Sequence, residues 1–221
     1  DDLIAECRRR LAEMLDCDCE EIEFLDGLFT VRATNHQLTF NDIAIQTIDN
    51  HGALKVIRKN EMHTPVYPNG TAICEVEIDP QTGTRTVTRY STIDDVGRCI
   101  NPLIVHGQTH GGIVQGAGQA LFEHCLIDSE SGQPLAGSLM DYGISRADDF
   151  PSFKTEIAEV LSPTNPLGIK AGGEGGTTPA LAAIVNAVVD ALADFGIEDI
   201  EMPVTPERIW KAIHTARMQQ N

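Results

Sequence analysis

A single carboxylate stands between two pairs of glycines in the segment GGEGG, residues 172–176. Glycine on both sides of Glu174 leaves the backbone unshielded, so a large flat ligand can approach it closely. The N–H groups of a helix that begins nearby favour negative charge, whereas burial beside an apolar ligand raises a carboxyl pKa. That competition suits a general base, which must be ionised and still basic. Spacing alone equally allows a solvated glutamate at a helix entry.

The same segment gives little support for a phosphate-binding loop. It lacks the lysine followed by serine or threonine that defines a P-loop. A dinucleotide-binding unit would need a further acid about 20 residues later at a strand end. Asp190 and Asp194 instead fall within or beside the predicted helix over residues 179–193.

A second glycine-rich stretch, residues 107–124, has a helical period and carries three glutamines. These are Gln108, Gln115 and Gln119. Amides both donate and accept hydrogen bonds, which suits a heterocycle with mixed edges, although surface glutamines would give the same pattern. Each glycine inside a helix costs about 1 kcal/mol relative to alanine. We therefore expect another helix or a ligand to approach this backbone closely.

The residue pattern gives weaker support for a metal site or for a cysteine cluster. His106 and His110 are four residues apart, but Gly107 stands where a zinc-binding helix motif has glutamate, so core or surface histidines are favoured. The six cysteines form no four-cysteine cluster for zinc or iron–sulfur binding. We expect them to be reduced thiols of a cytoplasmic protein.

Helical and strand periods predict an α+β fold, with a mixed sheet and hairpins against packed helices. The predicted helices span residues 2–15, 42–48 with Asn41 as cap, 107–124, 179–193 with Thr178 as cap, and a last one capped by Thr205. The predicted strands are a hairpin over residues 22–31 turning at Asp26–Gly27, a second hairpin over 71–94, and a strand over 153–161, with residues 49–70 as a loop. A composition shift divides the chain into a small unit, residues 1–50, and a larger one, residues 51–221.

Composition limits the partners of the 221-residue chain. The formal net charge of −17 opposes binding to nucleic acids and to anionic membranes. No apolar run approaches the roughly 20 residues that a membrane-spanning helix needs. The chain begins with Asp1 and a charged helix, which predicts no signal peptide and suggests a piece of a longer protein.

Four motifs, in this order, resemble the C-terminal part of the molybdopterin-binding large subunits of the molybdenum hydroxylases. They are IDDVGRCINPLIVHGQTHGGIVQGAGQALFE, LSPTNPLGIKAGGEGG, TPALAAIVNAVVDAL and MPVTPERIWKAI. This family includes xanthine dehydrogenase, aldehyde oxidoreductase and carbon monoxide dehydrogenase. The resemblance covers most of residues 70–213 and, more loosely, residues 1–50.

The resemblance implies oxidative hydroxylation of an aldehyde, purine or N-heterocycle carbon, with water as oxygen source. Glu174 matches the family's general base, and Gln108 matches a glutamine that hydrogen-bonds the pterin. Lys170, Gly172 and Gly173 would line the cofactor through their backbone. The cofactor would be molybdopterin, often the cytosine dinucleotide in bacteria. Iron–sulfur and FAD centres would belong to partner subunits or domains.

The family's large subunit is several hundred residues longer than this chain. The resemblance therefore implies that the chain needs the remainder of a large subunit and is inactive alone. Two other readings stay open: a non-catalytic assembly subunit or degenerate domain of the same fold, and an anion-binding module built on the helix at residue 179.

Overall fold

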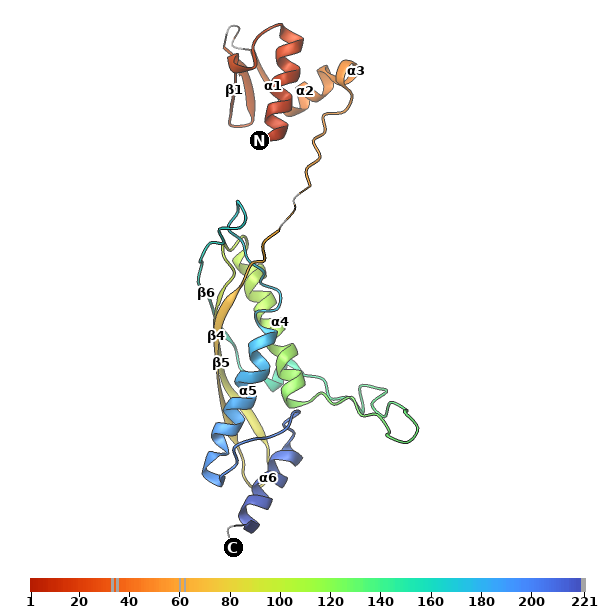
Figure 1. Cartoon of the computed structure of the whole chain (residues 1–221), viewed down its shortest axis with the longest axis vertical. Coiled ribbons are helices and arrows are strands. Elements are labelled where there is room, and N and C mark those ends of the chain that lie inside the picture. The colour runs from red at the N-terminus through yellow and green to blue at the C-terminus, as the bar shows by residue number, and fades with distance from the viewer. Residues whose placement is uncertain (33, 35, 60, 62, 220–221) are drawn as a thin grey trace. The chain divides into compact units, whose positions relative to one another are not determined.

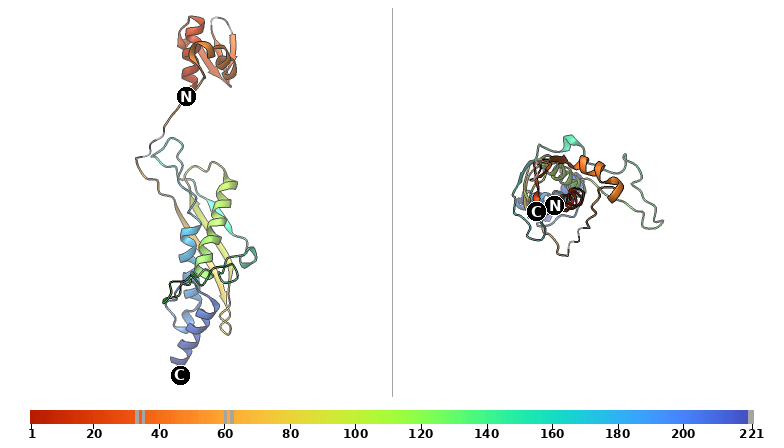
Figure 2. Two further views of the ribbon diagram at one scale, coloured as in Figure 1. Left: turned by 90° about the vertical axis from the view of Figure 1, so that its right-hand side faces the viewer. Right: turned by 90° about the horizontal axis from the view of Figure 1, so that it is seen from above.

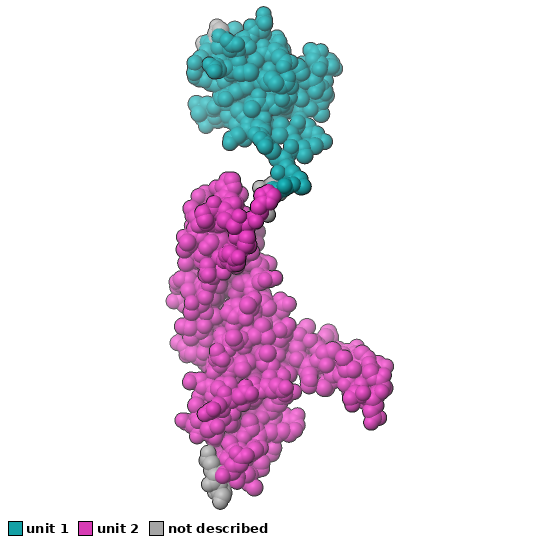
Figure 3. Space-filling view, in the orientation of Figure 1, with its two compact units in different colours: residues 1–61 teal, residues 62–221 magenta. Residues whose placement is uncertain are grey.

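The computed structural model describes residues 1–32, 34, 36–59, 61 and 63–219, and these form two compact units. Unit 1 is Asp1–Glu61 and unit 2 is Met62–Asn221 (Figure 3). The mixture of helices and open sheets confirms the predicted α+β class. The sequence pattern placed the division at residue 50, whereas the contacts place it after Glu61.

Unit 1 packs helices against a three-stranded antiparallel sheet of order β1-β2-β3. Its elements are α1 (Asp2–Leu15), the 3₁₀ turn η1 (Cys19–Glu21), β1 (Ile22–Leu25), β2 (Leu28–Val31), β3 (His36–Thr39), α2 (Phe40–Gln46) and α3 (Ile48–His51). The predicted helix and hairpin are confirmed. Asp26 and Gly27 turn the hairpin with φ values of 50° and 83°, as a two-residue primed turn requires.

The start of α2 differs from the prediction, because Thr39 and not Asn41 is the N-cap. The Thr39 hydroxyl accepts a hydrogen bond from the Asp42 N–H at 3.2 Å, and the Thr39 N–H donates to the Asp42 carboxylate at 2.9 Å. This reciprocal capping box satisfies two backbone donors at once. Strand β3 and helix α3 were not predicted, since each has only four residues and no clear period.

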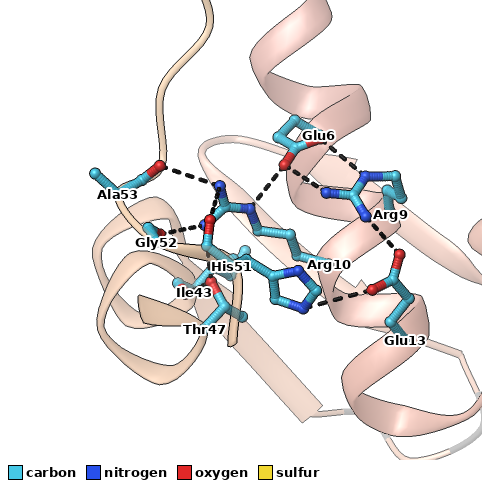
Figure 4. A network of polar contacts seen from close by, with 9 residues as sticks. All are labelled: Glu6, Arg9, Arg10, Glu13, Ile43, Thr47, His51, Gly52 and Ala53. Atoms are coloured by element: carbon cyan, nitrogen blue, oxygen red, sulfur yellow. Dashed lines mark hydrogen bonds and ion pairs between the residues drawn. The ribbon is translucent and has the colours of Figure 1, made fainter. Parts of the chain in front are cut away.

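A buried arginine ties the end of unit 1 to its first helix (Figure 4). The Arg10 guanidinium donates to the Gly52 carbonyl at 2.9 Å, to the Ala53 carbonyl at 3.1 Å and to the Glu6 carboxylate at 2.8 Å. Arg10 is only 4% exposed, so these partners replace the water that its charge has lost. This network extends unit 1 beyond the predicted boundary at residue 50.

Unit 2 is a three-stranded sheet with helices along one face (Figures 1 and 2). Its elements are β4 (Asn69–Ile78), β5 (Arg85–Asp95), α4 (Pro102–Leu121), η2 (Ala147–Asp149), β6 (Lys154–Ile157), α5 (Thr177–Ala191), η3 (Ala193–Phe195) and α6 (Pro206–Gln219). The central strand β5 pairs antiparallel with β4 and parallel with β6. Helix α5 packs on α4 and on β4, so these two helices cover the sheet.

The ends of two helices in unit 2 differ from the prediction. Helix α4 begins five residues earlier than residue 107, because the Asn101 side chain accepts from the Ile104 N–H at 3.3 Å and Pro102 occupies the first turn. Helix α5 begins at Thr177, so Thr178 lies inside the helix and is not its cap. The predicted helix with Thr205 as cap is confirmed, since the Thr205 hydroxyl accepts from the Arg208 N–H at 3.3 Å.

Glycines in α4 allow α5 to approach it closely. A Cβ atom on Gly116 would lie 2.6 Å from the Thr177 carbonyl oxygen, and one on Gly112 would lie 2.9 Å from the Thr177 nitrogen. Real Cβ atoms do not come so close to backbone. The expected close neighbour of this backbone is therefore another helix.

Two further observations bear on the chain's chemistry. Across the part of the chain that the structure describes, no helix is both long enough and apolar enough to span a membrane. All six cysteines are free thiols, with Cys7 buried in the core of unit 1.

Candidate functional site

A cavity of about 590 Å³ opens in unit 2 where the sheet, α4 and the loop before α5 meet. Its walls are the end of β5, the start of β4, one turn of α4 and the glycine-rich loop. The lining residues are Pro68, Asn69, Gly70, Asp94, Asp95, Val96, Thr109, Ala171, Gly172, Gly173, Glu174, Gly175, Thr178 and Pro179. This volume falls within the usual range for a site that binds a cofactor or small ligand.

Glu174 is an exposed residue in the lining of this cavity, where the loop turns into α5. Its backbone carbonyl accepts hydrogen bonds from the N–H groups of Thr177 and Thr178, both at 3.1 Å. These bonds hold the residue at the first turn of the helix while its side chain remains exposed. Glu174 therefore has a fixed backbone and a carboxylate that is accessible to a ligand.

The loop before Glu174 presents bare backbone to the cavity. A Cβ atom on Gly173 would meet no other atom within 4 Å, so the space beside it is open. A Cβ atom on Gly172 would lie 3.1 Å from the Val96 side chain, so this part of the loop packs directly against the end of the sheet. Such a wall accepts a flat ligand at backbone distance.

A buried ion pair fixes the loop to the sheet. Lys170 and Asp95 form a salt bridge in which both side chains are 10% exposed. Asp95 also accepts from the N–H groups of Gly97 at 2.9 Å and Val160 at 3.1 Å. Burial opposes ionisation of Asp95, but these hydrogen bonds prevail and lower its pKa below the usual value. The Lys170 N–H, in turn, donates to the Val96 carbonyl at 2.8 Å.

The predicted site residues occupy different positions relative to the cavity. Gly172, Gly173 and Glu174 line it together. Lys170 is directed to Asp95 behind the wall, and Gln108 is an exposed residue of α4 whose neighbour Thr109 lines the cavity. The cofactor contacts predicted for Lys170 and Gln108 remain predictions.

The sequence reasoning did not single out the acidic end of β5. Asp94 and Asp95 are buried and line the cavity, and burial raises the pKa of Asp94. The IDDVG segment contained a signal, because adjacent strand side chains point to opposite faces. One of these two acids must therefore point to the face that the helices cover. That the glycine-rich loop packs beside both acids depends on tertiary structure.

The two histidines of α4 contact one hydroxyl group. Nδ1 of His106 lies 2.7 Å and Nε2 of His110 lies 3.1 Å from Oγ1 of Thr155 on β6. In the described ranges, with their gaps at residues 33, 35, 60, 62 and 220–221, no three His, Cys, Asp or Glu side chains are grouped to hold a metal ion.

Comparison with known proteins places this site in a family. Residues 1–151 match the molybdopterin cofactor-binding domain, a span that ends before Glu174. The chain is 39% identical over 94% of its length to the 6-hydroxypseudooxynicotine dehydrogenase complex subunit gamma of Paenarthrobacter nicotinovorans, and it covers 27% of that protein.

Two solved structures have the same fold over almost the whole chain. Quinoline 2-oxidoreductase from Pseudomonas putida 86 is 35% identical with a TM-score of 0.80, over 96% of this chain and 28% of that one. Reconstituted CO dehydrogenase from Oligotropha carboxidovorans is 27% identical with a TM-score of 0.85, over 99% of this chain and 28% of that one. The chain thus spans about a quarter of the length of these relatives. It belongs to the molybdopterin-binding large subunits of the molybdenum hydroxylase family.

Proposed function

We propose that this chain forms the part of a molybdenum hydroxylase that encloses the molybdopterin cofactor and supplies the general base, Glu174. The observation that carries this proposal is the position of Glu174. It is an exposed residue that lines a cavity of about 590 Å³, and the adjoining part of the lining is glycine backbone. The match of residues 1–151 to a molybdopterin cofactor-binding domain supports molybdopterin as the ligand of that cavity.

The residues around the cavity fit a flat, polar cofactor. Gly172 and Gly173 leave room for close approach, and Thr109 and Thr178 add hydroxyl groups that can donate or accept. The exposed carboxylate of Glu174 adds negative charge that Lys170 does not balance, because Lys170 is paired with Asp95. That balance disfavours a simple anion-binding module at the start of α5.

The chain's own residues have distinct parts in the reaction. The bound cofactor supplies two-electron oxidation and the means to transfer oxygen derived from water. Glu174 accepts the proton from the oxygen nucleophile as that oxygen attacks an electron-poor substrate carbon. The carbonyl of Glu174 is fixed by two N–H groups of α5, which limits the positions that its carboxylate can take. The Asp95–Lys170 pair keeps the preceding loop in place.

The substrate and partner classes follow from the relatives. Their names refer to 6-hydroxypseudooxynicotine, quinoline and CO, and the wider family includes xanthine and aldehyde enzymes. We propose an aldehyde, purine or N-heterocycle as substrate, and the cytosine dinucleotide form of the cofactor. Partners would be the remainder of a large subunit and iron–sulfur and FAD subunits, in the cytoplasm. Gln108 would hydrogen-bond the pterin.

Analysis of bound metal and pterin tests this function. The protein would be purified from its native host with the polypeptides that accompany it, and molybdenum would be measured by mass spectrometry and pterin by fluorescence after oxidation. We expect close to one molybdenum and one pterin per chain. Full-length protein that contains neither would indicate a degenerate domain or an assembly subunit.

A further inference from the structure

Asp94 is a buried carboxyl group that lacks a complete set of hydrogen-bond partners. It is 6% exposed, at the end of β5. The Thr92 hydroxyl donates to its Oδ1 at 3.3 Å, but its Oδ2 has no hydrogen-bond partner among the described residues. Leaving such a group unsatisfied costs about 1–3 kcal/mol. The missing partner therefore needs an explanation.

The ionisable neighbours of Asp94 do not supply that partner. On β5 and the loop, Asp95 is bonded to Lys170, and Glu174 is exposed. Burial and, less strongly, the nearby Cys74 and Asp94 raise the pKa of Tyr90 on the same strand, and the buried Tyr90 hydroxyl has no hydrogen-bond partner among the described residues. On α4, His106 and His110 are engaged with Thr155. Burial raises the pKa of Asp94, and the bond from Thr92 opposes this only in part. Asp94 thus favours its neutral form more than a surface aspartate does, and a neutral acid has an O–H to donate.

Glycines lie on either side of the Asp94 carboxyl. A Cβ atom on Gly70 would lie 2.7 Å from Oδ1, and one on Gly175 would lie 3.7 Å from the same oxygen. All three residues line the cavity. The terminal torsion of aspartate is soft, so a small rotation presents Oδ2 to a ligand there. No side chain at positions 70 or 175 stands in the way.

We propose that Asp94 is a second ligand-binding residue of this cavity, donating a hydrogen bond to an acceptor atom of the molybdopterin cofactor. The inference rests on the proposed function and adds a contact from the end of β5, beside the loop that carries Glu174. The acceptor is a pterin ring nitrogen, a carbonyl oxygen or a phosphate oxygen. A neutral acid can donate to each of these, whereas a carboxylate would repel the phosphate. Asp94 and Glu174 then differ in role. Asp94 donates a hydrogen bond from its O–H group, whereas Glu174 removes a proton as a base.

Three variants test this assignment in the protein purified with its accompanying polypeptides. Asp94→Leu removes the donor, Asp94→Asn keeps one in its amide, and Asp199→Asn changes an exposed aspartate outside the cavity. After extended dialysis we expect molybdenum per chain to fall at least tenfold in Asp94→Leu. The Asn variant and the Asp199→Asn control should stay within about twofold of wild type.

Equal molybdenum content in Asp94→Leu and wild type would overturn the assignment while leaving the proposed function intact. Loss as large in Asp94→Asn as in Asp94→Leu would also overturn it, since it would mean that an ionised acceptor is needed. Wild-type protein without molybdenum would overturn both proposals.

A second measurement does not depend on the Leu variant folding. Carbon-13 NMR of the aspartate carboxyls in the 221-residue chain, assigned with Asp94→Asn, gives the pH at which Asp94 titrates. We expect Asp94 to be protonated at the pH of the molybdenum assay, and a carboxylate that is ionised at that pH would contradict the donor role.

Discussion

The side chain of Lys170 ties the glycine-rich loop to the end of the sheet. Its ammonium is buried against Asp95, which also accepts two backbone N–H groups from segments on either side. Three segments of unit 2 therefore meet at one carboxylate. The family resemblance points to a residue near the cofactor, and the structure gives its side chain a partner in the protein.

Removal of this ammonium should destabilise unit 2. Lys170→Met leaves Asp95 charged and buried without its main partner, which typically costs about 3–5 kcal/mol. Chemical denaturation would measure the change in free energy of unfolding. Lys154→Met is the matched control, because Lys154 forms only an exposed surface pair and should cost less than about 1 kcal/mol. Equal effects of the two variants would contradict the role given to the buried pair.

The lowered pKa of Glu6 predicts that the stability of unit 1 depends on pH. Hydrogen bonds from Arg9 and then Arg10 lower its pKa from 4.5 to about 2. A depressed carboxyl pKa stabilises the fold above the unfolded value, and that contribution is lost as the pH falls from 4.5 toward 2. We expect the stability difference between wild type and Glu6→Gln to be about 1 kcal/mol at neutral pH and to vanish near pH 2.

Thermal denaturation between pH 7 and pH 2 would measure that difference. Glu20→Gln provides the control. Glu20 is an exposed residue of η1, and it takes no part in the Glu6, Arg9 and Arg10 contacts. A stability difference for Glu6→Gln that stays constant or grows toward low pH would contradict the assignment.

At the scale of elements, glycines set the spacing of α4 and α5. Gly116 contacts the first turn of α5 too closely for any side chain, whereas a Cβ atom on Gly107 of the same helix would meet nothing within 4 Å. Helix packing therefore requires glycine at position 116, whereas glycine at position 107 only lowers the stability of the helix. This packing also positions the loop that carries Glu174.

A pair of variants in α4 tests this interpretation. Gly116→Val should destabilise unit 2 by about 3 kcal/mol or more, because the side chain would collide with Thr177 and Ala180. Gly107→Ala should stabilise it by about 0.5–1 kcal/mol through helix propensity alone. Urea denaturation would report both. A harmless Gly116→Val would mean that the helices can separate without cost.

The sequence predicted elements better than it predicted their contacts. Long periodic segments such as residues 2–15 and the hairpin of β4 and β5 were recognised, because their side-chain patterns repeat. Helix starts were predicted less well. The caps Thr39 and Asn101 are local signals that were overlooked, whereas α5 begins after Gly176, which makes no side-chain cap hydrogen bond. Glu174 was identifiable from its glycine neighbours, but Asp94 gained its significance only when the fold placed it in the lining of the same cavity.

At the scale of the whole chain, each unit has its own core. Leu11 is fully buried in unit 1, and Ile184 is 1% exposed in unit 2. Apolar surface buried within a unit stabilises that unit, so the two are expected to unfold as separate cooperative transitions. Both cores combine aliphatic with aromatic side chains although the aromatic content is only 5%, since Phe29 is fully buried in unit 1 and Tyr90 is 1% exposed in unit 2.

Truncation of one core at a time would test this independence. Leu11→Ala should lower the stability of unit 1 by about 2–5 kcal/mol, and Ile184→Ala should do the same to unit 2. Hydrogen exchange followed by mass spectrometry would assign each loss to residues 1–61 or to the remainder. Loss of protection across the entire chain in either variant would contradict the division.

The central claim is that Glu174 is the base of a molybdenum hydroxylase, and Glu174→Gln tests it most directly. The variant and a control, Glu198→Gln, which changes an exposed glutamate after η3, would be purified with their partners and matched for molybdenum content. Substrate-dependent reduction of the enzyme would be followed in a single turnover. We predict a loss of at least about 10²–10⁴-fold for Glu174→Gln, the usual contribution of a general base, and none for the control. Turnover of Glu174→Gln at the wild-type rate with full molybdenum would contradict the account.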